Sequence, residues 1–384
     1  MRVFVTGATG FVGSYVVAEL VGAGHQVVGL TRSDAGQQAL MRAGAEAFRG
    51  DVNDLARLRV AADAADGIIH TAFNHDFSKL KQASEEDRAV IATLGEALAG
   101  SDRPLIVTSG TGLARSKTGK PVVETDGYPT AAEYPRGATE EAADALADAG
   151  RRVMVMRLPQ VHDIAHNGRI AEHIRLARQK GRVAYVGEGA NRLPAAHVTD
   201  VAKLFRLVLE KGQAGRRYHA VAEEGVPLRD IAEVIGAGLH LPVDSLSLEE
   251  AKEYFGFFAT LAQMDLAASS AHTREELGWN PTSTDLLSDL RAMDYGAAAR
   301  FTRLRPHPYP SPQRGREIHF PFPLPLVGRG RGGGLSLSAR TPPQNKNGGA
   351  SRHRRFYFRE PAKVSSPARA PVGPRCPWRG RCPR

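Results

Sequence analysis

The sequence predicts an α/β fold, a doubly wound parallel sheet with a smaller C-terminal lobe. Apolar runs of strand length alternate with helical patterns from the first residues onward, as in repeated strand–helix–strand units. The strands are almost continuously apolar, which is typical of a parallel sheet covered by helices on both faces. A glycine-rich turn follows the first strand directly. Six strands are predicted, at Val3–Val5, Val27–Leu30, Ala45–Arg49, Gly67–His70, Leu105–Val107 and Val153–Met156.

The helical patterns divide the chain into three segments. The first helix is predicted from Gly13 to Val21, because Gly22 and Gly24 are typical of a helix end. We expect one domain at residues 1–160, a second lobe at 161–300 that completes the fold, and a separate segment at 301–384. The lobe is predicted to lie at the carboxyl ends of the strands, where such folds bind ligands. Its helices are predicted at Ile170–Gln179, Val198–Glu210, Leu228–Gly238, Leu248–Phe258 and Ser283–Ala299.

Residues 301–384 differ in composition from the rest of the chain. They hold 18 Lys and Arg residues, two acidic residues and 15 of the 24 prolines, so the net charge of +10 arises there. We expect this segment to be disordered. Its bias towards Pro, Arg and Gly is what translated non-coding sequence would give, so we interpret it as an artefactual or recently acquired extension. Basic and aromatic residues can bind nucleic acid, but charge alone is not specific, and no nucleic-acid partner is expected.

Cysteine usage and hydropathy indicate the compartment. Both cysteines, Cys376 and Cys382, lie in the basic segment, so residues 1–300 contain no disulfide framework and no cysteine-based metal site. No apolar run approaches the roughly 20 residues of a membrane-spanning helix, and the chain opens directly into a strand. We therefore expect a cytoplasmic protein with no membrane partner.

The glycine-rich turn has the composition of a phosphate-binding loop. Gly7, Gly10 and Gly13 lie between the first strand and the first helix. The first glycine permits a tight turn, the second lets the backbone approach a diphosphate, and the third allows close helix packing. The N–H groups and positive dipole of the helix start would then bind the anion. The alternative interpretation, an ordinary glycine turn, is disfavoured by the position of the motif between strand and helix.

The spacing of this loop, together with four further motifs, resembles the short-chain dehydrogenase/reductase superfamily in its extended, NAD-dependent epimerase/dehydratase form, which has a Rossmann-type fold. The motifs are Thr6 before G-x-x-G-x-x-G, Asp51-Val52, His70-Thr71-Ala72, the segment 157–162 and the segment 197–202, and the resemblance covers residues 1–292. It implies that the adenine, ribose and nicotinamide of a dinucleotide lie against these segments. The implied cofactor-binding residues are Thr6, Gly7, Thr9, Gly10, Phe11, Val12, Gly13, Thr31, Arg32, Asp51, Val52, Thr71, Ala72 and Pro159.

The residues after the second strand bear on the choice of cofactor. An NAD enzyme usually places an acidic residue there to bind the ribose hydroxyls, whereas this chain has Thr31 and Arg32. A guanidinium can make charge-assisted, bidentate contacts to a 2′-phosphate, which an acid would repel. We therefore favour NADP(H) over NAD(H). The alternative is that Arg32 is a solvated surface charge and Asp34 serves the ribose.

The catalytic residues that the resemblance implies are incomplete. The family uses a Ser or Thr after the fifth strand and a Tyr-x-x-x-Lys pair on the next helix, in which the lysine favours the phenolate. Ser109 is correctly placed, and Tyr134 is the candidate phenol, but Ala138 stands where the lysine should be. Tyr128 fails in the same way, and Arg136 should point elsewhere on a helix. This departure resembles the atypical branch of the superfamily, and a structural role for Tyr134 stays open beside a catalytic one.

Other polar residues allow both functional and structural interpretations. His75 and Asp76 follow the fourth strand and are interpreted as loop polarity or as groups facing the nicotinamide. His162 and His166 lie in a predicted loop without a third ligand, so no metal site is expected. Arg192 suits either an anionic substrate or a surface salt bridge. The aromatic residues in 254–258 suit core packing more than an apolar lid.

Two functions from different classes follow from these motifs. The first is an NAD(P)-dependent oxidoreductase or epimerase-like enzyme acting on a small carbonyl, enone or sugar-like substrate, with Ser109, Thr111 or water as the proton source. The cofactor carries the difficult chemistry in such enzymes. The alternative is a catalytically silent NAD(P)-binding sensor, whose bound cofactor controls a partner. The resemblance also makes a homodimer an expectation.

Overall fold

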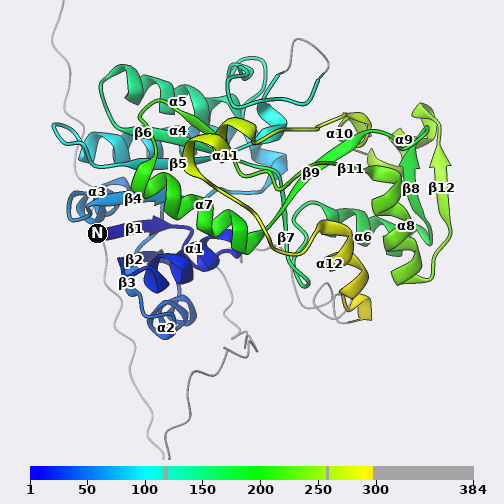
Figure 1. Ribbon diagram of the computed structural model, residues 1–384, viewed down its shortest axis with the longest axis horizontal. Coiled ribbons are helices and arrows are strands. Elements are labelled where there is room, and N and C mark those ends of the chain that lie inside the picture. Colours follow the sequence, from blue (N-terminus) through cyan, green and yellow to red (C-terminus); the bar gives the residue numbers. More distant parts are fainter. Residues whose placement is uncertain (116–119, 257–258, 297–384) are drawn as a thin grey trace, which may run out of the picture. The chain divides into compact units, whose positions relative to one another are not determined.

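The computed structural model describes residues 1–115, 120–256 and 259–296. The expectations for residues 301–384, Phe257 and Phe258 lie outside the described residues. The central element is a sheet of seven parallel strands in the order β10-β6-β5-β4-β1-β2-β3 (Figure 1). The chain runs outward from β1 to β3 and then returns to β4 and the other side, so the switch in direction lies between β1 and β4. The strands are β1 Arg2–Thr6, β2 Gln26–Thr31, β3 Glu46–Arg49, β4 Gly67–His70, β5 Leu105–Gly110, β6 Val153–Leu158 and β10 Arg217–His219.

Helices pack on both faces of this sheet, which confirms the predicted doubly wound fold. One hydrophobic core joins α1, α7 and Leu40 of α2 to one face, and a second joins α3, α4 and α5 to the other. These helices are α1 Phe11–Gly22, α2 Asp34–Arg42, α3 Leu55–Asp63, α4 Leu80–Ala97, α5 Gly137–Asp148 and α7 Val198–Lys211. The 3-10 turn η1 Phe77–Lys79 directly precedes α4, and the 3-10 turn η2 Thr111–Leu113 directly follows β5.

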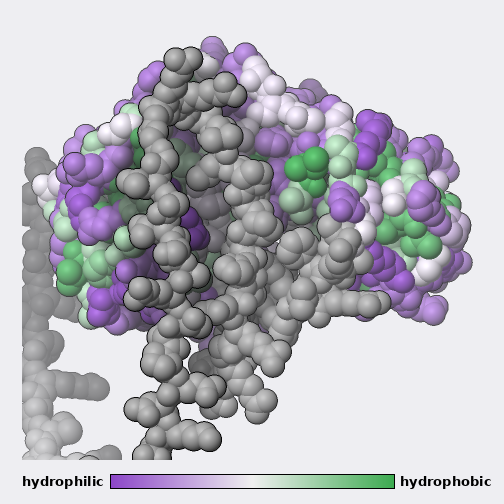
Figure 2. All heavy atoms as spheres, turned by 90° about the horizontal axis from the view of Figure 1, so that it is seen from below, coloured by the Kyte–Doolittle hydropathy of each residue, from purple (hydrophilic) through white to green (hydrophobic). Residues whose placement is uncertain are grey.

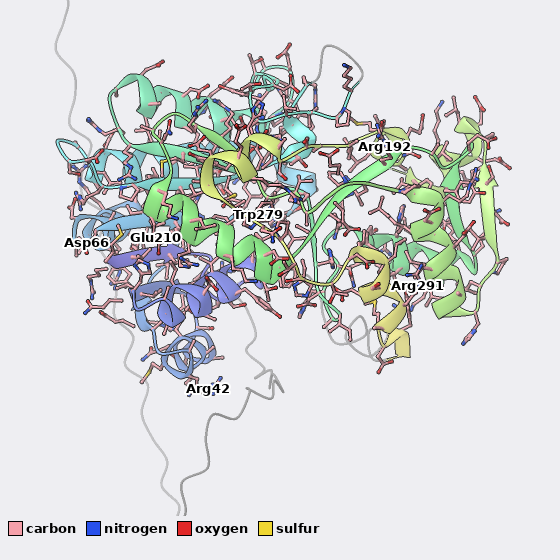
Figure 3. All side chains as sticks on the ribbon, in the orientation of Figure 1. Arg42, Asp66, Arg192, Glu210, Trp279 and Arg291 are labelled. Carbon is pink, nitrogen blue, oxygen red and sulfur yellow. The ribbon has the colours of Figure 1, made fainter. Side chains whose placement is uncertain are left out.

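Helix α7 illustrates how the sequence determines this packing. Its apolar residues recur three and four positions apart and so form one stripe along the helix. The five apolar side chains of this stripe are each at most 1% exposed, and burying each such side chain stabilises the fold by about 1.5–3 kcal/mol. Trp279, which follows helix α11 Ala271–Leu277, closes this core, and its Nε1 donates to the Asp200 carbonyl (Figure 3). The stripe consists of Val201, Leu204, Phe205, Val208 and Leu209.

The remaining elements form the second lobe. Strands β7, β9 and β11 make a three-stranded sheet, and β8 pairs with β12 in parallel (Figure 1). The chain after residue 160 thus contributes both this lobe and, through α7 and β10, part of the large sheet. The bounds are β7 Gln160–His162, β8 Val183–Val186, β9 Arg192–His197, β11 Glu223–Pro227, β12 Val243–Leu246, α6 Ile170–Lys180, α8 Leu228–Leu239, α9 Leu248–Phe255, α10 Ala259–Gln263 and α12 Leu286–Ala292.

The predicted helices of the lobe are found within one or two residues, with two exceptions. Helix α9 ends at Phe255 instead of Phe258, because Gly256 adopts a positive φ of 54°. The last helix covers Leu286–Ala292 and not Ser283–Ala299: Asp285 caps its start and Met293 is extended. Both predictions overestimated a helix because an apolar pattern does not reveal where the backbone leaves helical geometry.

The surface in Figure 2 is largely hydrophilic, with hydrophobic residues in smaller patches between polar ones. Among the described residues, seven large hydrophobic side chains are exposed, including Tyr134 and Ile164. In the same part of the chain, none of the helices combines the length and the apolar character that a bilayer crossing requires.

Candidate functional site

The glycine loop has the geometry of an anion-binding turn. Gly7 has φ +66°, and the Gly10 N–H donates to the Gly7 carbonyl at 2.8 Å. Helix α1 begins at Phe11 without a side-chain cap, so its first N–H groups remain available to a ligand. A Cβ on Gly13 would lie 2.1 Å from the Gly7 carbonyl oxygen, so only glycine permits this approach of helix to turn. This close packing of the helix start on the turn is the role that the sequence predicts for the third glycine.

The ends of β1 and β4 are joined at the switch point, directly beneath this loop. Thr6 Oγ1 lies 2.7 Å from His70 Nδ1 and accepts from the Ala72 N–H at 3.3 Å. The Thr71 hydroxyl donates to the Thr6 carbonyl at 2.8 Å, and a Cβ on Gly7 would lie 2.6 Å from Thr71 Oγ1. The structure therefore brings Thr6, Gly7, Thr71 and Ala72 together, as the sequence motifs imply.

A buried charge network extends from His70 to the start of α5. His70 Nε2 is 2.9 Å from Asp87, which also accepts from Arg136 at 2.7 Å. Burial opposes ionisation of Asp87, but Arg136, His70 and Thr139 outweigh it and lower the pKa of this carboxyl to about 2. Arg136 further donates to the Thr108 carbonyl at 3.3 Å and stacks 3.6 Å from the Phe73 ring centroid. The network therefore ties β4, α4, α5 and the end of β5 together.

The end of β2 carries the residues that bear on cofactor choice. Thr31 is buried, and Arg32 lies on the surface, 3.6 Å from Asp51. Asp34, the alternative ribose ligand, is 3.2 Å from Arg49. The structure therefore places the Arg32 guanidinium beside Asp51, whose Asp51-Val52 motif resembles the adenine contact of the family, at this edge of the sheet.

Ser109 is held in a buried ion network. Its hydroxyl donates to Glu140 at 2.8 Å, and Glu140 also accepts from Arg157 at 2.7 and 2.8 Å and from Arg217 at 2.8 Å. Glu140 and Arg157 are both fully buried. Burial alone would raise the pKa of Glu140, but the two arginines hold it below its ordinary value. The hydroxyl proton of Ser109 is thus engaged in a hydrogen bond to the Glu140 carboxylate in this structure.

Tyr134 lies away from this network. Its side chain is 41% exposed, while Ala138, one turn later, is fully buried. The residues of this helix start that reach the end of β5 are instead Arg136 and Glu140, which are also four positions apart. Sequence reasoning named Arg136 only as a side chain that points elsewhere than Tyr134 and did not consider Glu140, although the spacing of the two matches the Tyr-x-x-x-Lys pattern in chemically different residues.

The other predicted residues are placed as follows. Pro159 separates β6 from β7, Thr9 is exposed beside Gly10, Val12 is partly buried in α1 and Val52 packs against the second core. Arg192 forms a salt bridge to Asp265 at 2.7 Å, which accords with the structural interpretation (Figure 3). Tyr254 and Phe255 are core residues of the lobe. No group of three or more metal-ligating side chains occurs in the described ranges.

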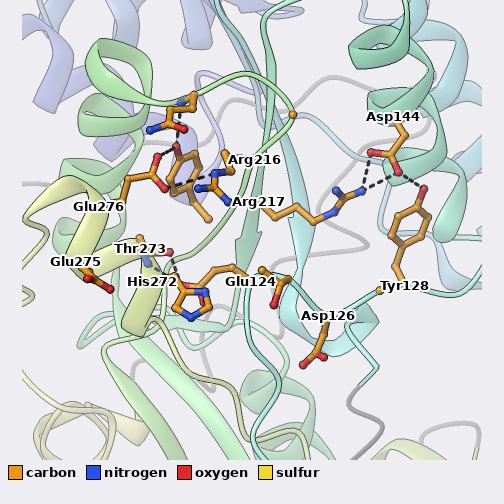
Figure 4. Close-up of a pocket in the computed structure, with 15 residues that line it drawn as sticks. Glu124, Asp126, Tyr128, Asp144, Arg216, Arg217, His272, Thr273, Glu275 and Glu276 are labelled. Atoms are coloured by element: carbon orange, nitrogen blue, oxygen red, sulfur yellow. Dashed lines mark hydrogen bonds and ion pairs between the residues drawn. The ribbon is translucent and has the colours of Figure 1, made fainter.

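A surface pocket lies along the open edge of β10, apart from the glycine loop. Arg217 lines it, donates to Asp144 at 2.7 and 2.9 Å, and lies 5.0 Å from the ring centroid of Tyr128 (Figure 4). The Tyr128 hydroxyl donates to the same carboxylate at 2.6 Å, and burial followed by this contact raises the pKa of the phenol. Tyr128 is therefore a poor proton donor or acceptor at neutral pH.

The fold and the glycine loop define a Rossmann-type α/β protein. The chain belongs to the NAD dependent epimerase/dehydratase family, whose model matches residues 3–221. It is 44% identical over 298 residues to the uncharacterized protein C2A9.02 of Schizosaccharomyces pombe, covering 77% of this chain and 100% of that one. It is 27% identical over 320 residues to a UDP-glucose 4-epimerase of Streptomyces lividans, covering 74% and 93%.

Solved structures agree with the fold. A dTDP-glucose 4,6-dehydratase from Streptomyces venezuelae, determined with NAD bound, matches with a TM-score of 0.62 and 19% identity over 79% of this chain and 98% of that one. A nucleoside-diphosphate-sugar epimerase from Pseudomonas aeruginosa matches with a TM-score of 0.62 and 21% identity over 78% and 98%. At such identities the likeness shows the fold alone.

Proposed function

We propose that this chain is an NAD(P)-dependent oxidoreductase or epimerase-like enzyme that acts on a small carbonyl, enone or sugar-like substrate. The observation that carries the proposal is the close approach of the start of α1 to the turn at Gly7, which an added Cβ on Gly13 would prevent because it would lie 2.1 Å from the Gly7 carbonyl oxygen. The diphosphate would bind the start of α1, and the adenine half would lie over Arg32 and Asp51. The nicotinamide supplies hydride transfer when bound. A cytoplasmic location and a homodimer are part of the same proposal.

The chain's own residues limit how a proton moves in this site. Ser109 donates to Glu140 and Tyr134 is exposed, so the usual lysine-assisted phenol is not assembled here. Proton transfer is assigned to Ser109, Thr111 or water, with Tyr134 as the phenol that a bound substrate would recruit. The commitment of both Arg136 and Glu140 to ion pairs favours the second candidate function, a catalytically silent NAD(P)-binding sensor. Turnover of any member of a carbonyl and enone panel with NADPH separates the two.

Cofactor preference is tested by titrating the protein with NADPH and NADH. We expect tighter binding of NADPH, because the guanidinium of Arg32 can bind a 2′-phosphate through charge-assisted hydrogen bonds. Arg32→Asp should lower NADPH affinity about 10- to 100-fold, the range of one such contact, and should improve NADH affinity. Arg42→Asp, the same charge change at the other end of α2, should leave the ratio unchanged. An unaltered ratio in Arg32→Asp would contradict the proposed NADP(H) preference.

A further inference from the structure

The loop after β7 places an imidazole against the start of helix α1. The ring of His166 stacks on the ring of Phe11, with centroids 4.9 Å apart and an interplanar angle of 27°. Phe11 is the first residue of α1 and directly follows Gly10 of the glycine loop. The two rings belong to segments more than 150 residues apart, so this contact joins the C-terminal lobe to the anion-binding turn.

Asp163 fixes the orientation of this imidazole. Its carboxylate lies 3.2 Å from His166 Nδ1 and accepts from the backbone N–H groups of Ala165 and His166 at 2.7 and 2.5 Å. The Tyr15 hydroxyl, one turn along α1 from Phe11, donates to the same carboxylate at 3.1 Å. The loop is therefore built to hold one imidazole in one orientation over the helix start.

The remaining nitrogen of His166 is available to a ligand. Because Nδ1 faces Asp163, a ligand would have to use Nε2, and none of the residues that the structure describes hydrogen-bonds to that atom. The side chain is 40% exposed. A protonated imidazole would present an N–H donor and a positive charge, both of which favour an anion. The N-terminus of α1, which begins at Phe11 without a side-chain cap, is the anion site of the proposed function.

From this geometry we infer that His166 binds the diphosphate of the dinucleotide, donating from Nε2 and closing the C-terminal lobe over the glycine loop. The inference rests on the proposed function, because the anion is the cofactor's. It assigns a cofactor contact to a segment that the motifs at the sheet edge do not include. His166 thereby couples cofactor binding to the position of the loop that ends at Gly168.

The groups packed around the His166 imidazole are a carboxylate, a phenol and a second histidine–carboxylate pair. Asp163 is the adjacent anion; burial alone would raise its pKa, but hydrogen bonds from His166 and from the Ala165 N–H hold the pKa below its ordinary value. On α1, burial and Asp163 raise the pKa of Tyr15 to about 12, so this phenol stays neutral. Behind Asp163, His162 pairs with Asp289 at 2.8 Å. The nearest ionised partner of His166 is therefore a carboxylate.

His166→Phe tests the inference, since phenylalanine keeps the stacking on Phe11 and removes the donor. Titration calorimetry of the full chain would use NADPH, NADH and adenosine 2′-monophosphate, which lacks the diphosphate. We expect the Kd values of both dinucleotides to rise about tenfold, as for loss of one charge-assisted hydrogen bond, with their ratio preserved. The Kd of adenosine 2′-monophosphate should not change.

Two further variants complete the experiment. His166→Gln retains an N–H donor and should lose less affinity than His166→Phe, and His272→Phe changes an exposed histidine in the pocket at β10 and should bind as the wild type. If the wild type binds both dinucleotides and His166→Phe binds them with the same Kd values, this inference is overturned and the proposed function stays intact. Absence of dinucleotide binding by the wild-type protein would overturn both. A uniform loss for all three ligands would assign His166 a merely structural role and also overturn it.

Discussion

Gly13→Ala is expected to abolish NAD(P)H binding and to destabilise the protein by about 3 kcal/mol, the upper range for overpacking a close contact. The added Cβ would lie 2.1 Å from the Gly7 carbonyl oxygen and 2.8 Å from its carbon. Both partners are backbone, so no side chain can rotate to relieve the clash. Helix α1 must move away from the turn, which displaces the N–H groups that would bind the diphosphate. Denaturant unfolding and cofactor titration measure the two effects.

Gly22→Ala is the matched control, because Gly22 is the last residue of the same helix and a Cβ there would meet no atom within 4 Å. Alanine should stabilise this position by up to about 1 kcal/mol through helix propensity, without any change in cofactor affinity. Wild-type affinity in Gly13→Ala would mean that the cofactor does not use this turn.

The glycine loop also shows what the sequence alone can predict. Strand, turn and the start of the helix follow one another within 13 residues, so local pattern determined the order of these elements. The six predicted strands are found as well, because most of them are short runs of apolar residues. Strand β10, Arg217–His219, was not predicted, because three residues carry no readable periodicity and its place beside β6 depends on packing of the whole chain.

The catalytic region was predicted less well for a different reason. Searching for Tyr-x-x-x-Lys selects residues by type, and it led to Tyr134 and Ala138 at the start of α5. The structure instead directs Arg136 and Glu140 to the end of β5, since helix phase is determined by which residues the core requires on the buried side. The partners of these two residues, Asp87 and Arg157, lie 49 and 17 residues away in the chain. Such pairings depend on the tertiary fold and leave no local pattern.

Glu140→Gln is expected to destabilise the protein by about 3 kcal/mol, because it leaves the fully buried guanidinium of Arg157 without a counter-ion. The amide keeps the size of the side chain, so the loss measures charge and not a cavity. Glu141→Gln is the control on the next residue: Glu141 pairs with Arg88 at 2.6 Å but is 29% exposed, and its loss should cost less than about 1 kcal/mol. If Glu140→Gln and Glu141→Gln lower the free energy of unfolding equally, the buried ion pair of Glu140 does not stabilise the fold more than the exposed pair of Glu141.

Glu140→Gln should also change how the free energy of unfolding depends on pH. The folded-state pKa of Glu140 lies below the ordinary 4.5, so the unfolded chain binds its proton first as the pH falls. The stability that Glu140 contributes is therefore fully present above pH 4.5 and is lost below it, with a slope of up to about 1.4 kcal/mol per pH unit. Asp87 behaves in the same way between its ordinary 3.8 and about 2. The free energy of unfolding, measured from pH 6 to pH 3, should consequently decline less steeply in Glu140→Gln than in the wild type. The decline that remains in the variant should be due to Asp87 and the other carboxylates with lowered pKa values.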